Sequence, residues 1–133
     1  MSKYAVLVAL FVATLLAGTA VPVIAAETTR DPMQHFFQQG FNNLPDEVAA
    51  AKSGGQLGVL IMFEAEDCPW CAKMKATVLN QVMVQDYYRQ HFRILMMDVN
   101  GDVPMTDFSG QEMSQKDFAF KHNRVRATPV FTF

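Results

Sequence analysis

The chain has 133 residues, of which 50% are hydrophobic and 18% are charged, and its formal net charge is −2 at pH 7. This length corresponds to about one ordinary domain, and the composition favours a packed core over global disorder. The slightly acidic charge argues against a nucleic-acid-binding protein, which is usually basic. Two cysteines exclude both a disulfide-rich scaffold and a four-cysteine zinc site.

The first 26 residues have the features of a secretory signal peptide. Lys3 is followed by 23 uncharged residues (4–26), which end on the small residues Ala25 and Ala26. Cleavage after either alanine would leave an exported domain. The alternative is an uncleaved membrane anchor, because a stretch of this length can just span a bilayer. Both interpretations place the domain outside the cytoplasm, where disulfides persist.

Residues 27–55 are interpreted as an N-terminal helical extension. Asp31 and Pro32 supply an N-cap and a first helical residue, and this helix is expected to end at Gly40. A second helix is predicted over residues 45–52, because it has acidic residues at its positive end and glycines after its last turn.

Residues 56–133 alternate between strand and helix patterns. The apolar run 57–63 indicates a strand buried on both faces. A helical stripe begins at Pro69, bends near Asn80 and continues to His91. Residues 93–99 form the next predicted strand.

The last predicted elements are a small hairpin, a helix and a strand. The hairpin covers residues 106–113, the helix starts at a capping box over 114–117, and the strand covers 128–133. The order of helices and strands predicts one α/β domain.

Cys68 and Cys71 form a C-x-x-C motif at the predicted junction of a strand and a helix. Cys68 precedes the helix, where free N–H groups and the helix dipole stabilise a thiolate. Cys71 lies one turn later on the side that faces the core. We therefore predict that Cys68 is the nucleophile and Cys71 the resolving thiol of a redox-active pair. Trp70 is expected to shape the approach of a thiol partner.

Three other interpretations of the two cysteines are less favoured. A purely structural disulfide would close a ring too short to remove much unfolded-state entropy. Half a zinc site would need two more ligands, and His35, His91 and His122 form no paired histidine motif. Two unrelated buried cysteines would not require a proline between them at a helix start. We therefore predict no metal, and no cofactor besides the Cys68–Cys71 disulfide itself.

The sequence resembles the thioredoxin superfamily over roughly residues 57–133. The resemblance rests on the apolar strand, the sequence Cys68-Pro69-Trp70-Cys71, the helix after it and the later pair Thr128-Pro129. Segments 63–71, 97–102 and 106–110 are similar to exported members, namely the periplasmic thioredoxins of sulfur-oxidation systems.

The resemblance implies a central mixed sheet with flanking helices. It also implies a periplasmic thiol–disulfide oxidoreductase that exchanges disulfides with protein thiols and with an upstream thiol redox partner. If the N-terminal segment is uncleaved, the domain would be anchored to the membrane and face the periplasm.

The resemblance also assigns roles to individual residues. Pro129 would be the cis proline that faces the active site, and Thr128 would offer backbone hydrogen bonds to a substrate chain. Thioredoxins have a buried acid six residues before the nucleophile, but that position is Met62 here. Glu64 lies two residues later, on the same strand face, and is the best substitute as a proton relay. Its alternative role is that of a solvated acid at a strand end.

Two other functions remain open at this stage. One is a periplasmic disulfide isomerase domain, although residues 27–55 are short for the dimerisation module that it would need. The other is a redox-inert module that binds peptides along the strand of Thr128 and Pro129. The sequence does not decide between an oxidant and a reductant, because Glu66 and Asp67 oppose the helix dipole at the nucleophile, whereas Lys73 and Lys75 act in the opposite direction.

The end of the sequence departs from a complete thioredoxin fold. Such a fold continues from the cis-proline strand into a partner strand and a final helix, whereas this sequence ends at Phe133. We therefore expect a C-terminally incomplete domain with an exposed apolar edge at Val130, Phe131 and Phe133.

Overall fold

The computed structural model describes residues 28–40 and 42–133. The predicted signal peptide or membrane anchor, residues 1–26, lies outside these residues. Within the described ranges, no helix combines the length and the apolar character that crossing a membrane requires.

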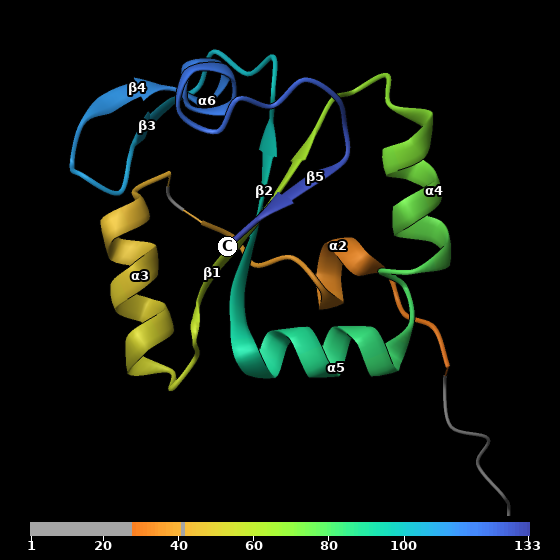
Figure 1. Ribbon diagram of the computed structural model, residues 1–133. Coiled ribbons are helices and arrows are strands. Elements are labelled where there is room, and N and C mark those ends of the chain that lie inside the picture. Colours follow the sequence, from red (N-terminus) through yellow and green to blue (C-terminus); the bar gives the residue numbers. More distant parts are fainter. Residues whose placement is uncertain (1–27, 41) are drawn as a thin grey trace, which may run out of the picture.

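A three-stranded mixed sheet with the order β2-β1-β5 forms the centre of the domain (Figure 1). The middle strand β1 (Gly58–Glu64) pairs parallel with β2 (Phe92–Asp98) and antiparallel with β5 (Val130–Thr132). The prediction of a central strand at 57–63 is confirmed. The five inner residues of β1 are all buried, which explains why its sequence is apolar without alternation.

Helices cover both faces of the sheet, as predicted. Helices α3 (Leu44–Ser53) and α6 (Gln115–Asp117) and the π-helical turn η1 (Phe118–His122) lie on one side (Figure 1). Helices α2 (Pro32–His35), α4 (Pro69–Thr77) and α5 (Val82–His91) lie on the other. A hydrophobic core lies on each face of the sheet, and successive β1 residues alternate between them. Val59, Ile61 and Phe63 pack on the α3 side, and Leu60 and Met62 pack on the α4 side.

The first helix is shorter than expected. Asp31 caps it as predicted, since its Oδ1 accepts a hydrogen bond of 2.9 Å from the Met33 N–H. The helix ends at His35 instead of Gly40. The Gln38 N–H donates to the Ile94 carbonyl at 2.8 Å, so the chain pairs with the free edge of β2 and cannot continue as a helix.

The predicted stripe from Pro69 to His91 consists of two helices, α4 and α5, and the prediction of a bend near Asn80 is confirmed. The Asn80 and Gln81 side chains donate to the carbonyls of Ala76 and Thr77 at 2.6 and 2.7 Å. These amides occupy carbonyl groups at the end of α4 and therefore stop the helix.

Residues 28–31, here called the N-terminal strap, lie across this break. The Arg30 N–H donates to the Asn80 carbonyl at 2.7 Å, and the Val82 N–H donates to the Thr28 carbonyl at 3.0 Å. The side chain of Gln85 is fully buried and donates to the Arg30 carbonyl at 3.0 Å. The strap is therefore held at the C-terminal end of α4.

The predicted hairpin is formed by β3 (Pro104–Thr106) and β4 (Glu112–Ser114). In its turn the buried Asp107 carboxylate accepts hydrogen bonds from the Ser109 N–H, the Ser109 hydroxyl and the Gln111 N–H, all within 2.8 Å. Gly110 has a φ of 85°, which favours glycine there. Ser114 caps α6 through a bond from the Asp117 N–H, as the capping box predicted.

Candidate active site

Cys68 and Cys71 are joined by a disulfide at the N-terminal end of α4. Cys68 is the N-cap residue of the helix and has an extended backbone. Its Sγ accepts a hydrogen bond of 3.0 Å from the Cys71 N–H. Pro69 is the first helical residue, where a missing N–H leaves no donor unsatisfied. The motif therefore both starts the helix and places one sulfur against its free N–H groups.

The two sulfur-bearing residues differ in burial. Cys71 is 1% exposed and belongs to the core between the sheet and α4, whereas Cys68 is 9% exposed at the edge of that core. Trp70 projects outward with 66% of its surface exposed, and Lys73 Nζ lies 5.3 Å from the centre of its ring. Cys68 is therefore the less buried of the two cysteines, and the exposed Trp70 lies two residues after it in sequence.

The loop before β5 lies against the disulfide. The Thr128–Pro129 peptide bond is cis, and Thr128 Oγ1 donates a hydrogen bond of 3.1 Å to Cys68 Sγ. Val125 anchors this loop, because its side chain is buried and its N–H donates to the Ala119 carbonyl at 3.0 Å. The structure thus brings together four of the residues singled out in the sequence: Cys68, Cys71, Thr128 and Pro129.

Glu64 lies at the end of β1 and forms an ion pair with Lys75, with 2.7 Å between Oε2 and Nζ. Both side chains are mostly buried. Lys75 follows Cys71 by one helical turn, so the pair lies on the α4 side of the sheet. Met62, at the position where thioredoxins have an acid, is fully buried in the same core. Glu64 is therefore a paired carboxylate and not a freely solvated one.

Two contacts of this site were not anticipated from the sequence. Thr128 contributes its side-chain hydroxyl in addition to any backbone group, and Lys75 is the direct partner of Glu64. The sequence analysis considered Lys75 only as a cation near Cys68. Its spacing of four residues from Cys71, which places both on one helical face, was the further signal in the sequence.

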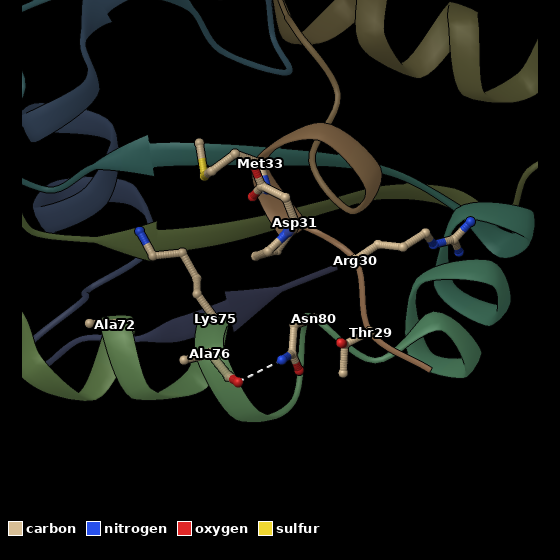
Figure 2. Close-up of a pocket in the computed structure, with 9 residues that line it drawn as sticks. Thr29, Arg30, Asp31, Met33, Ala72, Lys75, Ala76 and Asn80 are labelled. Atoms are coloured by element: carbon tan, nitrogen blue, oxygen red, sulfur yellow. Dashed lines mark hydrogen bonds between the residues drawn. The ribbon is translucent and has the colours of Figure 1, made fainter. Parts of the chain in front are cut away.

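Two cavities beside α4 do not include the disulfide in their lining. A pocket of about 580 Å³ separates the N-terminal strap from α4, and Figure 2 shows Lys75 extending from α4 along its edge. None of the residues that line this pocket belongs to the disulfide or the loop before β5. A smaller apolar cavity of about 260 Å³ lies between α4, α5 and β5. Among the described residues, no three His, Cys, Asp or Glu side chains are grouped as metal ligands.

Comparisons with known proteins agree with this architecture. Residues 44–133 match the model of a thioredoxin-like domain family. The solution structure of a thioredoxin from Thermus thermophilus is similar, with a TM-score of 0.51 and 23% sequence identity, which shows a shared fold. The match covers 73% of this chain and 62% of that thioredoxin, so the chain spans less than two thirds of its length. No curated protein sequence matches the chain. The chain belongs to the thioredoxin-like domain family.

Proposed function

We propose that this protein is an exported thiol–disulfide oxidoreductase that exchanges disulfides with protein thiols through Cys68 and Cys71. The observation that carries the proposal is the disulfide at the start of α4, with Cys68 at the edge of the core and Cys71 fully buried in it. Adjacent cysteines in a thioredoxin-like fold are suited to redox exchange.

The reaction follows from the different burial of the two cysteines. In the reduced protein, the Cys68 thiolate attacks a substrate disulfide, forms a mixed disulfide and releases one substrate thiolate. Cys71 then loses its proton and attacks Cys68 Sγ, which releases the second substrate thiol and forms the Cys68–Cys71 disulfide. Two electrons pass to the substrate, and an upstream dithiol partner restores the reduced protein by the same steps. A substrate dithiol is oxidised when the sequence runs in reverse.

Neighbouring residues support these steps. The Cys71 N–H and the Thr128 hydroxyl both point at Cys68 Sγ, so both can stabilise negative charge there. Pro129 and Trp70 flank the path of a substrate chain. Glu64 is proposed to accept the proton of Cys71, since it is a carboxylate on the α4 side of β1.

The proposed location is the periplasm, supported by the signal-like composition of residues 1–26. An anchored form that faces the periplasm has the same active site. Both locations are compatible with a persistent disulfide.

Trapping tests the proposed function. In Cys71→Ser the resolving thiol is absent, so mixed disulfides with protein substrates should accumulate through Cys68. The matched control is Cys68→Ser, which should form none. If Cys71→Ser forms no adducts, and a variant without either cysteine still binds peptides, then the protein is a binding module and not an oxidoreductase. Catalysis of disulfide reshuffling in a scrambled protein, without net reduction, would favour the isomerase.

A further inference from the structure

The surface around the disulfide carries charges of both signs on two separate loops. Glu66 and Asp67 are exposed in the loop between β1 and α4, here called the acidic loop (65–67). Arg124 and Arg126 are exposed in the loop that leads to β5, here called the basic loop (124–127). None of these four charges forms an ion pair with another described residue.

The two loops meet at the reactive sulfur. The acidic loop runs directly into Cys68, and the basic loop runs directly into Thr128, whose hydroxyl lies 3.1 Å from Cys68 Sγ. Arg126 is two residues before Thr128, so their Cα atoms are at most about 7 Å apart. In Figure 1 both loops lie at the end of the sheet where β1 finishes.

Packing directs the basic side chains outward. Val125 is 3% exposed and is fixed in the core by its side chain and by its N–H bond to Ala119. Its neighbours Arg124 and Arg126 therefore face solvent. The Arg126 guanidinium donates to the Val125 carbonyl at 3.1 Å and to no other group among the described residues. The guanidinium remains open to an anionic partner.

Unpaired charges at the rim of a contact surface mainly change the association rate of two molecules. They discriminate between partners by repulsion as well as by attraction. A substrate sulfur that reaches Cys68 brings its neighbouring residues over both loops. We propose that the acidic and basic loops select protein substrates whose reactive cysteine lies between a basic and an acidic residue, the basic one over Glu66 and the acidic one over Arg126. This proposal rests on the proposed function and adds the substrate class. Uniformly charged substrates meet repulsion at one of the two loops.

Three peptides of equal length test this selectivity. Each carries one cysteine as a mixed disulfide with a chromophoric aromatic thiol. The first has acidic residues before the cysteine and basic residues after it, the second has the reverse order, and the third has serines at these positions. The second-order rate of chromophore release by the reduced protein is measured at low and at high ionic strength. One charged order should react about two- to five-fold faster than the other at low ionic strength, and the difference should shrink in high salt.

A charge exchange identifies the residues responsible. In Glu66→Lys/Arg126→Glu the net charge of the protein is unchanged, but each loop becomes neutral, because Asp67 and Arg124 keep their original signs. The difference in rate between the two charged orders should therefore largely disappear. The control Lys52→Glu/Glu112→Lys exchanges two exposed charges outside the loops and should keep the wild-type preference. The ratio of the two orders is taken within each variant, so that a change in thiol reactivity cancels.

The outcomes separate the two proposals. Equal rates for both orders at low ionic strength, or an unchanged preference in the Glu66→Lys/Arg126→Glu variant, would overturn the selectivity and leave the oxidoreductase function intact. No chromophore release from any peptide, the serine peptide included, would overturn the oxidoreductase function and the selectivity together.

Discussion

Thr128 and Cys68 are separated by 60 residues in the sequence and are joined by a hydrogen bond from Thr128 Oγ1 to Cys68 Sγ. This contact connects the loop before β5 with the start of α4. The same sulfur accepts the Cys71 N–H, so two donors converge on it. Donors of this kind stabilise a thiolate more than a neutral thiol once the disulfide is reduced.

Thr128→Val keeps the shape of the side chain and removes its hydroxyl donor. We expect a smaller thiolate fraction of Cys68 at neutral pH and an attack rate about ten-fold lower, as for the loss of a hydrogen bond to a charged group. Ultraviolet absorbance of the thiolate across pH and the rate of alkylation by iodoacetamide measure the two effects. Thr132→Val in β5 is the matched control, and an equal response in both variants would contradict the role of the hydroxyl.

Glu64→Gln should slow the second step of the exchange and leave the first attack by Cys68 little changed. Cys71 is buried and must lose its proton as it attacks, and a positioned base typically accelerates such a step by about 100-fold or more. Stopped-flow measurements of mixed-disulfide formation and resolution across pH separate the two rates. Glu112→Gln, an exposed carboxylate on β4, is the control. If resolution is as fast as in the wild type, water is the base and Glu64 serves only to pair with Lys75.

Asp107→Asn should make the stability of the fold less sensitive to acid. The pKa of Asp107 lies below its usual value of 3.8, chiefly because the Gln111 N–H donates to the carboxylate and secondly because the Ser109 hydroxyl does. A carboxyl whose pKa is lowered by folding stabilises the fold above its unfolded pKa, and this contribution is lost as the pH falls through the folded pKa. Urea midpoints should therefore differ between variant and wild type near neutral pH and converge below pH 3.8. A difference that is constant across pH, or matched by the exposed control Asp102→Asn, would contradict the assignment.

Arg93→Met should destabilise the packing of α3 on β2. Arg93 Nε donates to Glu47 Oε2, and the Glu47 side chain is almost fully buried. Removing Arg93 takes away the guanidinium that donates to this buried carboxylate, and loss of one member of a buried ion pair costs about 3 kcal/mol in the free energy of unfolding. Urea unfolding of Arg93→Met and of the exposed control Lys52→Met gives the comparison. Adding Glu47→Gln to Arg93→Met should restore part of the loss, whereas equal stability of Arg93→Met and the control would contradict the prediction.

Local patterns in the sequence predicted much of the site. The C-x-x-C motif, the helix that starts at Pro69 and the apolar strand before it are contiguous in sequence, and each has a composition that a single element explains. The caps at Asp31 and Ser114 were also predicted, since a cap bonds within three residues of itself.

The hydrogen bonds between distant segments were not predicted, although the resemblance implied that Pro129 faces the active site. The early end of α2 depends on a bond between Gln38 and Ile94. The N-terminal strap depends on bonds between the Arg30 backbone and residues about fifty positions later. The Thr128 hydroxyl at Cys68 is of the same kind. Periodicity reports which face of an element is apolar and carries no information on which remote polar group will meet it.

The N-terminal strap and the reactive disulfide lie at opposite ends of α4. The Thr28 carbonyl is bonded to Val82 at the start of α5, beyond the C-terminal end of α4, whereas Cys68 caps the N-terminal end of α4. A helix of nine residues such as α4 is about 13 Å long. A bead, a lipid surface or a fusion partner joined ahead of Thr28 is therefore attached at the end of α4 opposite the reactive sulfur. Immobilisation through that end leaves the disulfide facing the surrounding liquid, where large partner molecules can reach it.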